Sequence, residues 1–310
     1  MVAQCLMPVM TLNIGERKLK VSGFTFVKDA IKFSFPVVES IKSILPICDE
    51  FIVNVGKSDD GTLDAISAIK SEKIKIIKSE WDPNFKYKGR ILAQQTDIAL
   101  AKCTGDWCFY LQADEVVHER DLDRILKRME EELSDERVEG LIFNWLHFYG
   151  DYSTFINSYH WYQREVRIIR NFRGIASWSS AQGFRLNGKK LRVKDTGAPV
   201  YHYGWVRPSK VMAAKKRYHD SLHHGNGWEK EYKKEKFDYL KHIDPAMLKK
   251  HEGNHPKVMR KRINEWQGEF DISNSTHRLT FKDIRNRISD FIARRTGWKI
   301  GEYKNFILIK

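Results

Sequence analysis

Two short polar segments carry the residue types that chemistry needs, and each follows an apolar run. The segment Gly56–Thr62 (GKSDDGT) follows Phe51–Val55, and the segment Gln112–Glu115 (QADE) follows Trp107–Leu111. Their acidic residues are Asp59, Asp60, Asp114 and Glu115. Clustered carboxylates repel one another and select hard cations such as Mg²⁺, Mn²⁺ or Ca²⁺. Because Mg²⁺ and Mn²⁺ often join carboxylates to a diphosphate, the pattern indicates chemistry on a nucleotide or sugar diphosphate.

Each segment also has a purely structural interpretation. Asp-Asp-Gly-Thr is a good turn and helix start, and Asp-Glu before a helix also caps it. The functional interpretation requires that the two segments meet. They do so if their strands are parallel neighbours, because ligands of open α/β sheets bind beyond the carboxyl ends of strands, near a switch in strand order.

The elements that position these segments follow from the spacing of apolar residues. Short apolar runs predict strands at 20–27, 51–55, 73–78, 107–111 and 140–148. Apolar residues at helical spacing predict helices at 36–45, 63–69, 88–102 and 122–133. Strands that alternate with helices predict right-handed crossovers and an open, mostly parallel α/β sheet flanked by helices.

Three parts of the chain differ in pattern. Residues 1–18 are expected to be an N-terminal extension. A domain is expected over 19–205, with the α/β half at 19–148 and short, aromatic β segments at 149–205. Residues 206–310 are expected to be a basic, mainly helical C-terminal extension that does no bond-making, and its segment Tyr218–His224 is expected to be a solvated helix.

Composition excludes several classes of protein. The chain of 310 residues is 42% hydrophobic and 12% aromatic, which excludes a mainly disordered protein. It has no run of 18 apolar residues, and its first ten residues make a poor secretory signal. Its four cysteines form no CxxC and no paired zinc spacing. We therefore expect a reduced, cytoplasmic protein.

The excess positive charge is confined to the last third of the chain. The net charge is +14, and residues 206–310 alone hold 25 Lys and Arg against 13 Asp and Glu, a net charge of +12. Such an excess suits an anionic partner or is simply a solvated basic face. In RNRISDFIARR, Ile284, Ile288 and Phe291 lie on one helix face between arginines, which is typical of a helix at a membrane surface. The alternative is a helix docked on the main domain.

The stretch from Val21 to Glu115 resembles the nucleotide-binding half of a family 2 glycosyltransferase of the GT-A fold. The first matching element is the turn after the second strand, with Ser58, Asp60 and Thr62. The second is GDWCFYLQADE, where the family has Gly-Asp-Trp, an apolar strand and Asp-Ala-Asp-Glu. The two elements stand in the family's order and at its spacing, and the match extends over about residues 19–150.

The resemblance implies a transferase that moves a sugar from a nucleotide-diphosphate donor to a saccharide or lipid-linked acceptor, with inversion. Asp114 matches the second Asp of the family's metal motif, so it would bind Mn²⁺ or Mg²⁺. Gln112 replaces the first Asp and adds no charge, so metal affinity could be weaker. Asp29 and Asp60 match donor-side positions. Arg90 lies where a basic residue often faces the donor, and its alternative role is a surface arginine at a helix start.

An inverting transfer also needs a general base for the acceptor hydroxyl. The region in which relatives often carry this acid, SWSSAQGFR, has none. We therefore select Glu165, in QREVRIIR, whose alternative role is an ion pair with Arg164 or Arg167. Several GT-A enzymes complete the metal site with a late histidine, and His202 is the candidate here. Its alternative role is that of a satisfied core histidine.

Other functions remain open at this stage. A catalytically inactive glycosyltransferase-like binding protein is consistent with Gln112 and with the missing acid near residue 182. A nucleotidyltransferase has a similar layout of acids, but its usual Gly-rich loop is absent from Val27–Ala30. No zinc finger, RNA-recognition or helix-turn-helix signature stands out, so we expect no nucleic-acid partner. The leading hypothesis is surface polysaccharide or glycolipid synthesis in the cytoplasm, with peripheral contact at the inner face of the membrane.

Overall fold

The computed structural model describes residues 19–82, 85, 87–224, 235–268 and 270–310. The expected N-terminal extension at 1–18 lies outside these residues. The strands are β1 (Val21–Val27), β2 (Glu50–Gly56), β3 (Ile74–Ser79), β4 (Trp107–Tyr110), β5 (Glu115–Val117), β6 (Gly140–Tyr149), β7 (Thr154–Ile156), β8 (Arg164–Arg170), β9 (Ile175–Trp178), β10 (Gly183–Leu186), β11 (Lys189–Lys190), β12 (Arg192–Trp205), β13 (Leu248–Lys250) and β14 (Ile307–Leu308). The α-helices are α1 (Val37–Ile44), α2 (Thr62–Ser67), α3 (Arg90–Leu100), α4 (Leu122–Glu131), α5 (Ser209–His224), α6 (Arg260–Asn264) and α7 (Phe281–Thr296).

The parallel strands predicted for the first half are confirmed. Strands β3, β2, β1 and β4 lie side by side in that order, and each adjacent pair is parallel. Every residue of β2 and β4 is buried, as expected for strands covered on both faces. The chain runs outward from β1 through β2 to β3 and then returns to the other side of β1 for β4. The switch in strand order therefore falls between β1 and β4.

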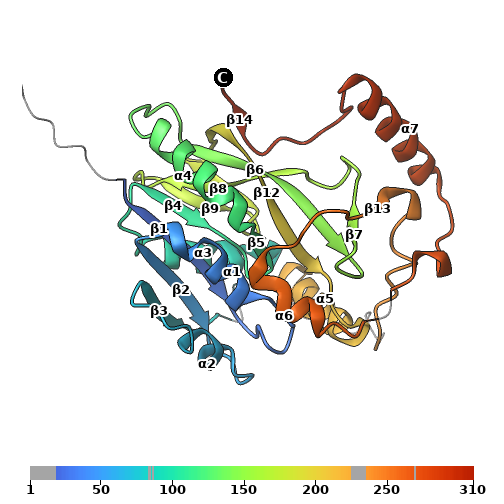
Figure 1. Ribbon diagram of the computed structural model, residues 1–310, viewed down its shortest axis with the longest axis horizontal. Helices are drawn as coiled ribbons and strands as arrows, with labels where there is room; N and C mark the ends of the chain where they lie inside the picture. The colour runs from blue at the N-terminus through green and yellow to red at the C-terminus, as the bar shows by residue number, and fades with distance from the viewer. Residues whose placement is uncertain (1–18, 83–84, 86, 225–234, 269) are drawn as a thin grey trace, which may run out of the picture.

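The second half adds mostly antiparallel strands to the same sheet. Strand β8 pairs antiparallel with β4 and β6, and β7 and β13 continue the sheet beyond β6. The long strand β12 pairs in parallel with β6, while its C-terminal part pairs antiparallel with β5. In that register His202 lies opposite Glu115, which brings β12 next to the QADE segment. The sheet is thus mixed overall, with its parallel part at the first four strands (Figure 1).

Helices cover both faces of the sheet. Apolar residues of α1, α2 and α4 pack with one face in a single cluster that includes Ile41, Ile66 and Ile125. On the other face, α3 packs together with the small sheet β9–β10–β11 through Ala99 and Phe184. The predicted α/β architecture with flanking helices is confirmed.

The C-terminal part is built into the domain. Strand β13 extends the sheet at β7, and β14 pairs with the start of β12. Helix α7 lies outside the sheet on the side of β7 and β13 (Figure 1). Within the described ranges, no helix has both the length and the apolar character needed to cross a membrane.

Candidate active site

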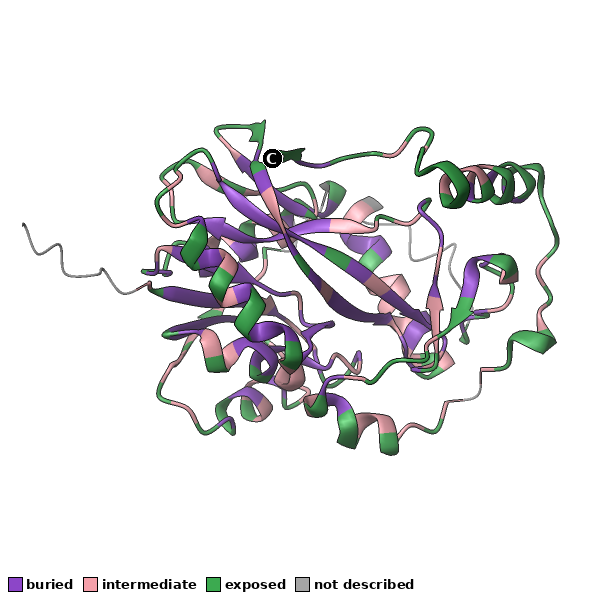
Figure 2. Cartoon of the chain, turned by 45° about the horizontal axis from the view of Figure 1, so that its top comes forward, coloured by how far each residue is buried: buried purple, intermediate pink, exposed green. Residues whose placement is uncertain are grey.

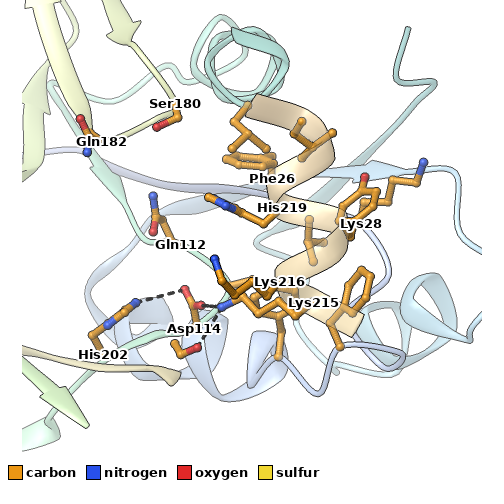
Figure 3. Close-up of a pocket in the computed structure, with 18 of the residues that line it drawn as sticks. Phe26, Lys28, Gln112, Asp114, Ser180, Gln182, His202, Lys215, Lys216 and His219 are labelled. Atoms are coloured by element: carbon orange, nitrogen blue, oxygen red, sulfur yellow. Dashed lines mark hydrogen bonds and ion pairs between the residues drawn. The ribbon is translucent and has the colours of Figure 1, made fainter. Parts of the chain in front are cut away.

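A cavity of about 390 Å³ opens at the carboxyl ends of β1 and β4, where the strand order switches. Lys28 follows β1, while Gln112 and Asp114 follow β4. Helix α5 covers the cavity from the other side and contributes Lys215 and His219 (Figure 3). Strands β6, β8 and β12 and their flanking segments add further lining residues, among them Tyr162, Glu165, His202 and Gly204.

Asp114 is a buried acid in the wall of this cavity. Its Oδ2 accepts hydrogen bonds from Lys215 Nζ at 3.1 Å and from Arg207 at 3.4 Å. Its Oδ1 lies 3.9 Å from His202 Nε2 on the other side (Figure 3). Burial alone would raise the pKa of Asp114, but the cationic Lys215 and Arg207 hold it well below its usual value. The carboxylate is therefore ionised at neutral pH.

The lysine that holds Asp114 is itself largely withdrawn from solvent, with its side chain 19% exposed. Burial and the neighbouring Arg207 lower the pKa of Lys215 to about 8, while Asp114 opposes this shift. Lys215 also donates to the Gly204 carbonyl at 2.9 Å. Arg207 is completely buried and binds the Phe33 carbonyl at 2.7 Å, so it ties the end of β12 to the loop after β1.

A pair of histidines fixes the atom that faces Asp114. His147 Nε2 lies 2.7 Å from the Tyr162 carbonyl, and His147 Nδ1 lies 3.1 Å from His202 Nδ1. Burial lowers the pKa of His147 to about 4 and that of His202 well below its usual value, so both rings are neutral at pH 7.

The protons of the two rings follow from these partners. A carbonyl only accepts, so His147 carries its proton on Nε2 and accepts at Nδ1. His202 must then donate from Nδ1, which leaves the lone pair of its Nε2 facing Asp114 Oδ1. Two electron-pair donors 3.9 Å apart suit a cation held between them. The residues therefore fit a divalent cation, although no group of three or more His, Cys, Asp and Glu ligands occurs within the described part of the chain.

Glu165 lines the same cavity from β8. Its side chain is buried, and its Oε2 has no hydrogen-bond partner. Burial raises the pKa of Glu165 to about 7, although Arg167 opposes the shift. Arg167 instead forms a bidentate pair with Glu115, with two contacts of 2.7 Å, and Arg164 binds Asp195. Both arginines therefore pair with other acids, and neither forms an ion pair with Glu165.

Gln112 also lines the cavity, and its contact with the donor stays a prediction. Its Nε2 donates to the Ala181 carbonyl at 3.0 Å. This bond holds the amide in place beside the cavity. Of the seven site residues selected from the sequence, four come together here: Gln112, Asp114, Glu165 and His202.

The other three selected residues do not line the cavity. Asp60 Oδ1 accepts from the Thr62 amide at 3.0 Å and Oδ2 accepts from the Lys32 amide at 2.7 Å, so Asp60 joins two loops. Asp29 has a left-handed backbone (φ 54°), and burial raises its pKa. Arg90 is exposed at the start of α3, with its guanidinium 5.7 Å from the Phe85 ring centre. Contact between these three residues and a nucleotide-sugar donor stays a prediction.

The contribution of α5 was missed. The expectation that Tyr218–His224 forms a solvated helix is wrong, because Tyr218, His219 and His223 line the cavity. The signal was present in the sequence: Lys215, His219 and His223 are four residues apart and share one helix face. The segment was expected to be solvated because no acidic residue shares the spacing of its histidines, which argues against a metal site.

Comparisons with known proteins identify one matching family. The model of one protein family, Glycosyl transferase family 2, matches residues 36–190, half of the chain. No curated protein matches the sequence.

Among solved structures, S. aureus TarS is 14% identical, with a TM-score of 0.37 over 69% of this chain and 41% of that one. Mannosyl-3-phosphoglycerate synthase from Rubrobacter xylanophilus is 17% identical, with a TM-score of 0.30 over 42% of this chain and 41% of that one. Glucosyl-3-phosphoglycerate synthase from Mycobacterium tuberculosis, solved with Mn²⁺, uridine diphosphate and phosphoglyceric acid, is 18% identical, with a TM-score of 0.27 over 42% and 43%. The chain thus spans about two fifths of each of these solved chains.

Proposed function

Because the chain belongs to glycosyl transferase family 2, we propose that it transfers a sugar from a nucleotide-diphosphate donor to a saccharide or lipid-linked acceptor, with inversion. The observation that carries this proposal is the convergence of Asp114, His202, Glu165 and three lysines on one cavity at the switch in strand order. A role in surface polysaccharide or glycolipid synthesis is part of the same proposal.

Two side chains would hold the divalent cation, Mn²⁺ or Mg²⁺. Asp114 would bind it through Oδ1 and His202 through Nε2, with diphosphate oxygens and water as the remaining ligands. When bound, such a cation supplies a Lewis acid that offsets negative charge on the departing diphosphate. Lys215 and Arg207 keep Asp114 ionised and fixed in one orientation. The remaining lining lysines, Lys28 and Lys216, add positive charge around the diphosphate.

Glu165 is proposed to act as the general base. Inverting transfer needs one group that takes the proton of the acceptor hydroxyl while the bond to the donor phosphate breaks. A pKa of about 7 suits this task, because the group is then both available as carboxylate and able to accept a proton. The unpartnered Oε2 leaves an oxygen for that proton.

A metal-independent binding protein is the second candidate. One observation favours it: Lys215 and Arg207 already occupy Asp114 Oδ2, so that the carboxylate is partly neutralised without a metal. In this case the cavity would bind a nucleotide sugar without transferring the sugar.

A panel of nucleotide sugars read by thermal shift, with and without Mn²⁺, tests the proposal. We expect one donor to raise the melting temperature only with metal. A ligand at a concentration of about 100 times its Kd adds about 2.7 kcal/mol to the free energy of unfolding. Release of the nucleoside diphosphate with an acceptor present would establish transfer. Stabilisation without metal and without turnover would favour the binding protein. Release of inorganic pyrophosphate would indicate nucleotidyl transfer. No stabilisation by any donor would contradict both candidates.

A further inference from the structure

Helix α7 is oriented with its polar side inward and its apolar side outward. On its inner side, Asp283, Asn286 and Asp290 are buried. On its outer side, Phe281 is 92% exposed, and three further apolar side chains are about half exposed. These three are Ile284, Ile288 and Phe291. A helix that packs on its own domain shows the opposite arrangement, with apolar residues facing the core.

Hydrogen bonds and an ion pair hold this orientation. Arg287 forms a bidentate pair with Asp244, with contacts of 2.6 and 2.7 Å. Asp290 Oδ1 accepts from the Tyr159 amide at 3.2 Å, and His160 lies 2.8 Å from the Ser289 hydroxyl. The capping box between Thr280 and Asp283 fixes the first turn. The apolar face is therefore exposed in the folded protein because the polar face is already engaged.

The apolar surface continues past the helix and is bordered by basic residues. Trp298 is 66% exposed and Ile300 is 45% exposed in the segment that follows α7. The exposed basic residues of the helix beside this surface are Lys282, Arg285, Arg294 and Arg295. The two acids of α7, Asp283 and Asp290, are buried on the opposite side. Figure 2 shows α7 as a largely exposed helix at the margin of the molecule.

We infer that the surface formed by Phe281, Ile284, Ile288, Phe291 and Trp298 lies on an anionic lipid bilayer. The apolar side chains enter the boundary between head groups and acyl chains, while the bordering arginines and lysine contact lipid phosphates. Charge separation across the helix supports this occupant, because both acids point away from the surface and four cations border it. A large exposed apolar patch with a basic border marks an interaction site.

The position of α7 connects this surface with the cavity. Segment 159–163 binds α7 and the following residues through Tyr159, His160 and Gln163, the last accepting from Lys299 at 2.5 Å. Tyr162 in the same segment lines the main cavity. An acceptor carried on a lipid would therefore approach the cavity past the segment that holds α7. This last point rests on the proposed function, whereas the lipid contact does not.

Sedimentation with vesicles tests the inference. The full chain is mixed with vesicles of phosphatidylcholine, or of phosphatidylcholine with phosphatidylglycerol. We expect binding to the anionic vesicles that falls at least tenfold in the triple variant Phe281→Ser/Ile288→Ser/Phe291→Ser. Arg294→Gln/Arg295→Gln should lower binding about 30-fold, which corresponds to about 1 kcal/mol per residue. The matched control Lys70→Gln/Lys127→Gln removes the same charge from exposed sites far from α7 along the chain and should bind like the parent.

The outcomes separate the lipid surface from other occupants. Equal binding by the triple variant and the parent, or no preference for anionic vesicles, would overturn the inference. Dimerisation in sedimentation velocity that the triple variant abolishes, without vesicle binding, would assign the surface to a second copy of the chain. Metal-dependent nucleotide binding measured on the same proteins reports on the proposed function separately, and we expect it to be unchanged in these variants.

Discussion

At the scale of single residues, Glu165 has an environment unlike that of an exposed carboxylate. It lies buried beside a bidentate Arg167–Glu115 pair, and its pKa is raised to about 7. Burial disfavours the charged form, and Arg167, already paired with Glu115, offsets only part of this cost. A base with this pKa is active when deprotonated, so the transfer rate should rise between about pH 6 and 8 and then level off.

The variant Glu165→Gln tests this assignment by both rate and stability. We expect the rate to fall by about 10² to 10⁴ and the dependence on pH to disappear. Because the folded-state pKa is raised, the contribution of Glu165 to stability is present below about pH 4.5 and is lost as the pH rises through about 7. At pH 8 the variant should therefore be more stable than the parent by up to about 3 kcal/mol. Urea denaturation at pH 4.5 and 8 measures this, and a variant that kept full activity would exclude Glu165 as the base.

Arg207 gives a second prediction at this scale. It is completely buried and binds Asp114 together with the Phe33, Tyr203 and Gly204 carbonyls. In Arg207→Met these acceptors lose their donor, and the free energy of unfolding should fall by about 3–5 kcal/mol. The exposed Arg124→Met serves as the control and should change it by less than about 0.5 kcal/mol. Equal urea midpoints for the two variants would contradict the role given to Arg207.

At the scale of secondary structure, the parallel half of the fold could be predicted and the second half could not. Trp107–Leu111 is a continuous apolar run and Phe51–Val55 is apolar except for Asn54, a pattern typical of parallel strands buried on both faces. The pairing of β12 with both β5 and β6 depends on residues about 50 to 85 positions apart, and local spacing contains no information about it. That pairing is what places His202 next to Asp114.

The same limit applies to the site. Asp114 and Gln112 could be found because they follow a recognisable strand, and Glu165 and His202 because the proposed chemistry needs a base and a metal ligand. His147 could not be found, because its role depends on the cross-strand pair with His202. Lys215 was missed because a lysine in a basic helix is usually solvated, whereas here Asp114 and the Gly204 carbonyl hold it.

Gly204 provides a prediction about the position of β12. A Cβ at this residue would lie 2.4 Å from the His202 ring and 3.1 Å from Asp114 Oδ2. Because both side chains are buried, Gly204→Ala must push the His202 ring out of place. We expect at least a tenfold loss of metal-dependent nucleotide affinity in a protein that still unfolds cooperatively. Unchanged affinity by isothermal titration would show that the His202 position does not matter for binding.

At the scale of the whole molecule, the C-terminal third is an integral part of the domain. The interpretation of residues 206–310 as an appendage rested on their charge, yet α5 lines the cavity and β14 pairs with β12. An excess of charge describes the exposed residues of a segment and does not show whether the segment docks on the domain. The buried apolar residues that dock this segment, such as Phe306 and Met212, are too few to stand out in the sequence.

Removal of Tyr303–Lys310 tests this integration. Phe306 is buried against the cluster on one face of the sheet, and Asn305 binds Arg185. Loss of the buried phenylalanine alone should lower the free energy of unfolding by about 3 kcal/mol or more. The control Tyr303→Ser changes a residue that is 71% exposed and should leave stability within about 0.5 kcal/mol. A truncated chain as stable as the parent would mean that this segment does not dock.

The cation site between Asp114 and His202 is the central claim, and isothermal titration of nucleoside diphosphates tests it most directly. Uridine and guanosine diphosphate are titrated into the parent, Asp114→Asn and His202→Phe, each with Mn²⁺ or with a chelator. We predict that one nucleotide binds the parent only with Mn²⁺ and binds neither variant. His202→Phe leaves no charge unpaired, so we expect its circular dichroism spectrum to show a folded protein. Equal affinity with Mn²⁺ and with chelator, or in His202→Phe and the parent, would contradict the account.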